Sequence, residues 1–155
     1  MNTIADLIAE HSFFRELERA DLEFLAGCGR NVHFSSGERI LAEGDPANTF
    51  FVVRAGRVAL GFLAPGNGNV IIDTLDGGDV LGWSWLFEPY VWHFDADAVE
   101  PVSAVAFDAV CLRTKCESDP RLGYRLTQGF ARVILERLHS TRLRMLDMYG
   151  VVPTR

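Results

Sequence analysis

The segment TFFVVRAGRVALGFL, residues 49–63, contains two runs of β-branched and aromatic residues on either side of Gly56. Such residues favour extended strands, and a glycine between two runs favours a tight turn. The segment therefore predicts two strands with a turn between them. Further short runs of the same kind occur on both sides of it, and they are NVHF at 31–34, ERILAEG at 38–44, NVIIDTL at 69–75 and FDADAVEPVSAVAF at 94–107.

Turn-forming sequences separate these runs at regular intervals. They are SSG at 35–37, EGDPAN at 43–48, APGNGN at 64–69 and DGGD at 76–79. Short strands at such spacing are typical of a sandwich or a closed barrel, because both architectures protect strand edges in a small domain. We therefore expect a mainly β (α+β) fold whose body, residues 31–108, is an antiparallel β jelly-roll barrel, also called a double-stranded β-helix.

Apolar residues recur at helical spacing at both ends of the chain. Short N-terminal helices are expected within residues 1–30. After the strands, residues 109–149 predict a short helix and then a long one that starts near Pro120, because proline is favoured in the first turn of a helix. Residues 150–155 are expected to form a tail. The length of 155 residues fits a single domain, 1–155.

The long helix carries an apolar stripe at spacing close to a heptad. Its members are Phe130, Ile134, Leu138, Thr141, Met145 and Met148. A helix of roughly thirty residues is about 45 Å long, which is more than so small a barrel can cover. The stripe therefore predicts a homodimer through this helix. The alternative is that the stripe packs back on the barrel of its own chain.

The net charge of −6 is unevenly distributed along the chain. Residues 1–112 carry six basic and seventeen acidic side chains, whereas residues 113–155 carry nine basic and four acidic ones. A basic segment can contact nucleic acid, but the acidic body weakens long-range attraction to DNA. We interpret the basic end as a solvated helix face or as a surface for an acidic protein partner.

The three cysteines, Cys28, Cys111 and Cys116, show no C-x-x-C spacing. We therefore expect buried free thiols rather than a disulfide framework or a zinc site. The sequence has no apolar run long enough to span a bilayer, and its first fifteen residues mix charged with apolar side chains, unlike a secretory signal. These features predict a cytoplasmic protein that makes no membrane contact.

The order of these elements and three glycine-containing motifs resemble the cyclic nucleotide-binding domain of the Crp/Fnr regulators. EGD at 43–45 is similar to the turn after the family's first strands, TFFVVRAGRVAL at 49–60 to its next hairpin, and LDGGDVLGW at 75–83 to its l.pGdffGE motif. The resemblance covers roughly residues 15–149. It implies a sensor in which a ligand inside the barrel shifts a binding cassette and the long helix.

In that family, the segment after the glycine equivalent to Gly82 is a phosphate-binding cassette. Helix N-terminal amides and an arginine hold the cyclic phosphate, while a glutamate accepts a hydrogen bond from the ribose. The resemblance places Trp83 at the glutamate position and His93 at the arginine position. Tryptophan donates but does not accept, and histidine lacks the permanent charged fork of arginine. With Asp95 adding a negative charge nearby, ordinary cAMP binding is disfavoured.

The candidate ligand-binding residues of the cassette are Gly82, Trp83, Ser84, Trp85, Leu86, Trp92, His93 and Phe94. Their aromatic faces suit a neutral aromatic or a cationic ligand. Two alternatives are that the rings fill the pocket as solid core, or that weak cyclic nucleotide binding is retained. If the stretch after His93 is a strand, Phe94 points inward with two alanines, whereas Asp95 and Asp97 point to solvent.

No catalytic or metal site is predicted. A cupin-like metal enzyme uses a similar jelly roll, but only His33 and His93 fall within the barrel and no H-x-H pair is present. The sequence ends at Arg155, without the helix-turn-helix of the family's DNA-binding members, so direct sequence-specific DNA binding is not expected.

We interpret the sequence as a non-catalytic, homodimeric ligand-sensing module that signals to a regulatory protein partner. No cofactor is certain beyond a small-molecule ligand in the barrel, for which a cyclic nucleotide is disfavoured. The alternative is a component of a Crp/Fnr-type transcriptional regulator that retains weak cyclic nucleotide binding.

Overall fold

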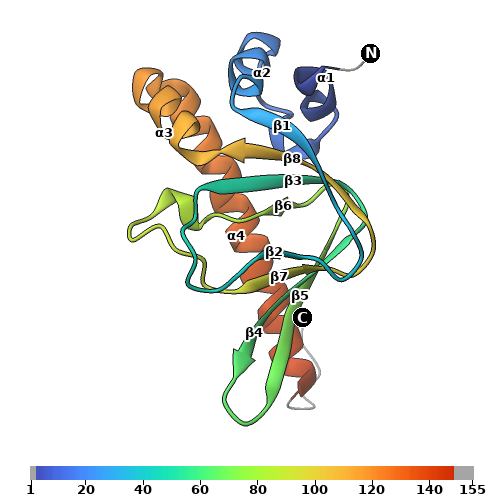
Figure 1. Cartoon of the computed structure of the whole chain (residues 1–155). Coiled ribbons are helices and arrows are strands. Elements are labelled where there is room, and N and C mark those ends of the chain that lie inside the picture. Colours follow the sequence, from blue (N-terminus) through green and yellow to red (C-terminus); the bar gives the residue numbers. More distant parts are fainter. Residues whose placement is uncertain (1–2, 149–155) are drawn as a thin grey trace.

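The computed structural model describes residues 3–148, apart from the side chains of Arg144 and Met148. The predicted tail, 150–155, lies outside this range. Eight antiparallel strands form two four-stranded sheets with the core between them (Figure 1). The first sheet has the order β1 (Gly29–Phe34), β8 (Val102–Asp108), β3 (Thr49–Ala55) and β6 (Val80–Leu81). The second has the order β2 (Arg39–Leu41), β7 (Asp95–Ala98), β4 (Arg57–Ala64) and β5 (Gly68–Asp76).

The two sheets do not close into the predicted barrel, although the mainly β fold with flanking helices is confirmed. Two of the four edge strands are very short: β6 has two residues and β2 has three. Strands of this length offer too few backbone groups to form a ladder that would join the sheets. Short edges also leave little unpaired backbone exposed to other chains.

The hairpin that the family resemblance implies around Gly56 is not formed, because β3 and β4 belong to different sheets. The chain turns a corner at Gly56, which has φ of 98°. A Cβ atom at this position would lie 2.2 Å from the carbonyl oxygen of Pro101, so only glycine fits. A true hairpin follows, in which β4 pairs with β5 across a turn that includes Gly66 and Gly68.

The predicted helices are present at both ends of the chain. The N-terminal ones are α1 (Ile4–Ala9), the single 3-10 turn η1 (Ser12–Phe14) and α2 (Arg19–Ala26). Asp108 starts α3 (Ala109–Ser118) as its N-cap, because its side chain accepts a hydrogen bond from the Cys111 amide at 2.8 Å. The long helix α4 (Pro120–Met148) begins at the predicted proline.

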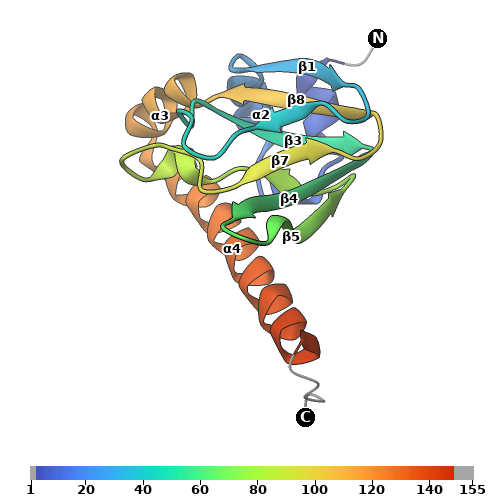
Figure 2. The ribbon, with the colours of Figure 1, turned by 60° about the horizontal axis from the view of Figure 1, so that its bottom comes forward.

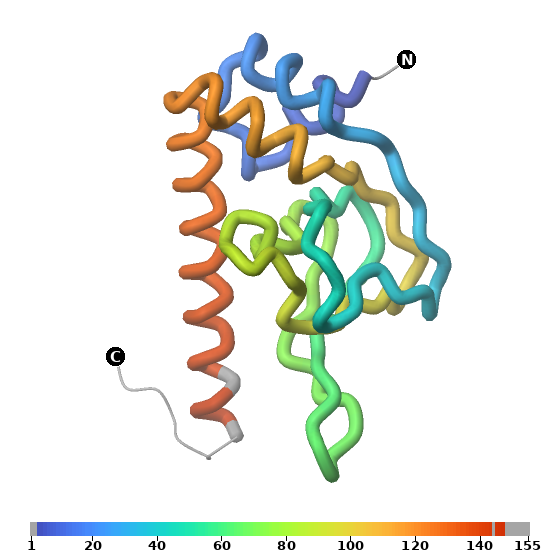
Figure 3. The backbone as a smooth tube through the Cα atoms, turned by 60° about the vertical axis from the view of Figure 1, so that its left-hand side comes forward, coloured from blue at the N-terminus to red at the C-terminus, as the bar shows by residue number. Residues whose placement is uncertain are grey.

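Helix α4 runs along the side of the two sheets (Figures 2 and 3). Its first half belongs to the core, since Leu122, Leu126 and Phe130 are buried. Phe130 meets Phe50 of β3 edge to face, with the ring centroids 5.0 Å apart. Among residues 3–148, no helix is both long and apolar enough to cross a lipid bilayer.

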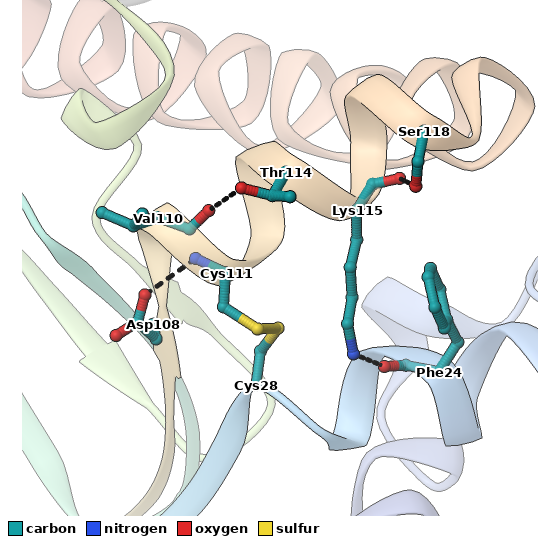
Figure 4. The surroundings of a disulfide bond; sticks show 8 residues. All are labelled: Phe24, Cys28, Asp108, Val110, Cys111, Thr114, Lys115 and Ser118. Carbon is teal, nitrogen blue, oxygen red and sulfur yellow. Dashed lines mark hydrogen bonds between the residues drawn. A yellow bond between two sulfur atoms is a disulfide. The ribbon is translucent and has the colours of Figure 1, made fainter.

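The expectation of three free thiols is wrong for two of them, because Cys28 and Cys111 form a disulfide (Figure 4). Pairing of β1 with β8 sets Gly29 opposite Phe107, which brings the residue before β1 next to the first turn of α3. The bond therefore ties the end of α2 to α3. Lys115 of α3 makes a second link, because its ammonium donates to the Phe24 carbonyl and lies 4.4 Å from the centroid of the Phe24 ring.

Candidate ligand-binding groove

The predicted cassette starts where β6 ends. Gly82 has φ of 97°, and a Cβ atom there would lie 2.7 Å from the Trp92 ring, so glycine lets this indole pack on the backbone. Trp83 follows, and then a single 3-10 turn, η2 (Ser84–Leu86). Three residues provide few aligned backbone amides, so the cassette offers a weaker anion site than a full helix would.

Two of the three tryptophans belong to the core. Trp85 is 1% exposed, stacks on Phe50 at a centroid distance of 5.4 Å and meets Phe130 edge to face at 5.3 Å. Trp92 is 4% exposed, Ser84 is also buried, and Leu86 is half-buried against the same core. The interpretation of the aromatic rings as solid core therefore holds for Trp85 and Trp92.

Trp83 and Phe94 instead line a groove between the sheets and α4, with a volume of about 240 Å³. The two rings are tilted, with centroids 5.9 Å apart. Most of the lining is apolar, and it consists of Leu60, Ile72, Asp73, Trp83, Phe94, Ile134, Arg137, Leu138 and Thr141. The volume lies just below the range of about 300–1,000 Å³ that is usual for ligand sites, so the groove suits a small ligand.

The structure corrects the placement of His93, which is exposed and does not line the groove. The reason is strand alternation: Phe94, Ala96 and Ala98 point into the core along β7, so the residue before Phe94 points outward. Asp95 and Asp97 lie on the outer side, as expected. Both form ion pairs with Arg39, at 3.6 and 2.9 Å respectively.

Arg137 is a groove residue that sequence reasoning missed. Its guanidinium carbon lies 4.6 Å from the centroid of the Trp83 ring, and its Nη2 donates to the carbonyl oxygen of Val80. Burial lowers the pKa of Arg137 to about 10, even though Asp73 and Asp79 oppose this shift. The sequence could have pointed to Arg137 by its position, because it lies three residues after Ile134 and one before Leu138. It is therefore next to the predicted apolar stripe on the helix surface.

A second arginine holds the other end of the cassette. Arg113 of α3 donates from Nη1 to the Trp85 carbonyl oxygen at 2.7 Å, and its guanidinium lies 4.4 Å from the centroid of the Tyr90 ring. Tyr90 has φ of 55°, a left-handed conformation that is uncommon for a residue with a side chain. The loop between β6 and β7 is therefore held by one arginine from α3 and one from α4.

A family model for the cyclic nucleotide-binding domain matches residues 31–119, from β1 to the end of α3. This match covers more than half of the chain. The chain belongs to the cyclic nucleotide-binding domain family of the Crp/Fnr superfamily. The expected resemblance is thereby confirmed, and the groove lies between the β-roll of this domain and its C-terminal helix.

Relatives of this domain include transcriptional regulators. The chain is 25% identical over 151 residues to a CRP-like cAMP-activated global transcriptional regulator of Mycobacterium tuberculosis, covering 97% of this chain and 66% of the relative. It is 31% identical over 112 residues to the nitrogen fixation regulation protein FixK of Bradyrhizobium diazoefficiens, covering 72% of this chain and 46% of that protein. The chain thus spans two thirds or less of the length of these relatives.

A solved structure shares the whole fold. The crystal structure of a putative cyclic nucleotide-binding protein from Geobacter metallireducens is 27% identical, with a TM-score of 0.79, and the match covers 90% of this chain and 100% of that one. The described part of this domain has no group of three or more His, Cys, Asp or Glu side chains placed to hold a metal ion.

The predicted dimer stripe divides into three groups in the folded domain. Phe130 is fully buried in the core of its own chain, which corrects its assignment to an interface. Ile134, Leu138 and Thr141 line the groove, and Leu138 is also 65% exposed. Met145 is 52% exposed, whereas the side chain of Met148 lies outside the described part. The prediction also missed Leu135, which is 65% exposed.

Proposed function

We propose that this domain is a non-catalytic ligand sensor whose ligand binds in the groove between the β-roll and α4. The observation that carries the proposal is the pair of rings, Trp83 and Phe94, in the wall of a mostly apolar groove. In the family, the cassette that borders this position holds the ligand. Here the same position presents aromatic faces, which suit a flat apolar ligand.

Cyclic nucleotide binding of the usual kind does not fit this groove. Trp83 occupies the position that the resemblance gives to the ribose-binding glutamate, and an indole accepts no hydrogen bond from a hydroxyl. His93 points away from the groove, and Asp73 lines it. Losing one charge-assisted contact removes about 1.5–3 kcal/mol of binding free energy.

The two arginines supply a physical route from the groove to the helices. A ligand that displaces the Trp83 ring disturbs its contact with Arg137 of α4, and movement of η2 disturbs the hydrogen bond from Arg113 of α3 to Trp85. The ligand shifts the equilibrium between two arrangements of these helices only if it binds one arrangement more tightly. The changed helix surface is then presented to a regulatory protein partner.

The output end of the sensor is proposed to be a homodimer through α4. Leu135, Leu138 and Met145 are spaced by three and seven residues, so they share one helix face, and all three are largely exposed. Leu138 both borders the groove and lies on this face. Leu138 is therefore proposed to contact both the ligand and the second copy of the chain.

The test uses the indole N–H signals of the three tryptophans in an NMR titration of the ¹⁵N-labelled domain. We expect unlabelled indole, a neutral aromatic probe, to shift the Trp83 signal, while the signals of the buried Trp85 and Trp92 change much less. We expect cAMP and cGMP to give no saturable change at millimolar concentration. Single Trp→Phe variants assign the three signals.

Two outcomes contradict the proposal in different ways. Saturable binding of cAMP at micromolar concentration would make the domain a cyclic nucleotide receptor with unusual contacts. Failure of indole to shift the Trp83 signal at millimolar concentration would mean that the groove is not a binding site for aromatic ligands.

A further inference from the structure

Arg137 is a charged residue in the wall of the groove whose hydrogen bonds are incomplete. Its Nη2 donates to the Val80 carbonyl oxygen, but its Nη1 is buried and finds no hydrogen-bond partner among the described residues. A guanidinium has five N–H groups and no acceptor, and a buried donor without a partner is unfavourable. A ligand oxygen placed beside Nη1 would accept a hydrogen bond from it and so remove this unfavourable contribution.

The charge of Arg137 decides which kind of oxygen fits. Burial lowers its pKa only to about 10, so the guanidinium keeps its positive charge at neutral pH. A carboxylate supplies both the acceptor oxygen and the opposite charge, and such charge-assisted bonds are stronger than neutral ones. One carboxylate carries one negative charge, which matches the single positive charge of the guanidinium.

The remaining lining of the groove decides what the rest of the ligand resembles. Trp83 and Phe94 offer aromatic faces on the β-roll side, and Ile134 and Leu138 offer aliphatic side chains on the α4 side. A flat, apolar ring fits between such walls, since aromatic groups pack well by stacking and edge contacts. The volume of about 240 Å³ limits the ring system to a small one.

We propose that the groove binds a small aromatic monocarboxylic acid, with its ring against Trp83 and Phe94 and its carboxylate on Arg137. This inference rests on the proposed function, because it names the ligand class of the same groove. Binding requires the Arg137 guanidinium to turn, so that its buried Nη1 reaches a carboxylate in the groove that Arg137 lines. The ligand thereby takes part in the contact between Trp83 and α4.

A calorimetric titration of the whole chain with indole-3-acetate and its neutral amide, indole-3-acetamide, tests this inference. The two probes share a ring and differ in charge. We expect the carboxylate to bind about ten- to a hundredfold more tightly than the amide, which is the range for one charge-assisted contact. Arg137→Met should abolish this preference but still bind indole, which shows that the variant is folded with an intact groove.

Arg132→Met is the matched control, because Arg132 lies on the same helix, does not line the groove and forms an exposed ion pair with Glu16 at 3.6 Å. It should keep the preference for the carboxylate. Equal affinities of the wild-type domain for both probes, or a preference that survives Arg137→Met, overturns the inference. If neither probe binds while indole still shifts the Trp83 signal, the ligand class is wrong and the sensor proposal stands. If indole also leaves the Trp83 signal unchanged, both the ligand class and the sensor proposal are wrong.

Discussion

Arg113 on α3 donates a hydrogen bond to the backbone carbonyl oxygen of Trp85 at 2.7 Å, which joins the cassette to the helix that precedes α4. The same guanidinium lies over Tyr90, so one side chain holds two points of the loop between β6 and β7. A partly buried contact of this kind contributes to stability as well as to communication, because both partners leave water when it forms.

Arg113→Ala should therefore lower the free energy of unfolding by about 1.5–3 kcal/mol, the range for hydrogen bonds to charged groups. Arg113→Lys should lower it by less, because lysine keeps the charge but not the planar fork. Urea unfolding followed by tryptophan fluorescence measures both. Equal stability of the alanine variant and the wild type would show that the contact contributes nothing.

Gly56 and Gly66 provide a matched pair for testing the corner between the sheets. Both have positive φ, 98° and 83°. A Cβ atom at Gly56 would clash with the Pro101 carbonyl oxygen, whereas a Cβ atom at Gly66 would have no other atom within 4 Å. Gly66→Ala should lower stability by only about 1–2 kcal/mol, the cost of a left-handed residue with a side chain. Gly56→Ala should lower it by more than about 4 kcal/mol. Similar urea midpoints for the two variants would contradict the tight corner.

The disulfide between Cys28 and Cys111 joins residues that are 83 positions apart. In the chain-entropy model, closing a loop of this size stabilises the folded state by about 4.5 kcal/mol. The double variant Cys28→Ser/Cys111→Ser should lose stability of this order, and a reductant should destabilise the wild type but not the variant. Cys116→Ser, at the free thiol, is the control and should behave like the wild type. Resistance of the wild type to the reductant would argue against the bond.

The exposed face of α4 should hold two copies together. Leu135→Ser combined with Leu138→Ser should weaken the dimer by at least about a hundredfold, since burying one leucine stabilises by about 1.5–3 kcal/mol. Sedimentation velocity over a concentration series measures this. Leu143→Ser is the control, because Leu143 is also exposed but lies on a different face of the helix, and it should leave the dimer intact. A wild-type domain that sediments as a monomer at micromolar concentration would refute the dimer.

His11 should make stability depend on pH below neutrality. Its Nδ1 accepts a hydrogen bond from the Phe13 amide at 3.3 Å, and burial lowers the pKa of His11, although Asp79 opposes the shift. With a lower pKa in the folded state, the unfolded chain binds the proton first as pH falls below about 6.5, so this contribution to stability is present above that pH and is lost below it. His11→Gln should flatten the dependence of the urea midpoint between pH 7.5 and 5.5. An unchanged slope would exclude His11 as a cause.

Much of the fold follows from local features of the sequence. Runs of β-branched residues separated by glycine turns predict the strands, Pro120 lies where α4 begins, and the motif at 75–83 is one of three that identify the family. Alternation in residues 94–98 correctly places the alanines inside and the two aspartates outside. These features are readable because strand alternation, helix caps and turn conformations depend on a few neighbouring residues.

The sequence by itself determined the family, the order of the elements and the position of the cassette, because these depend on local patterns. Only the tertiary structure decided which side chains meet. The pairing of β1 with β8 brings Cys28 to Cys111, and the angle at which α4 crosses the roll buries Phe130 and sets Arg137 against Trp83. Each of these contacts joins residues far apart in the chain, so its geometry depends on how whole elements pack and not on the spacing of nearby residues.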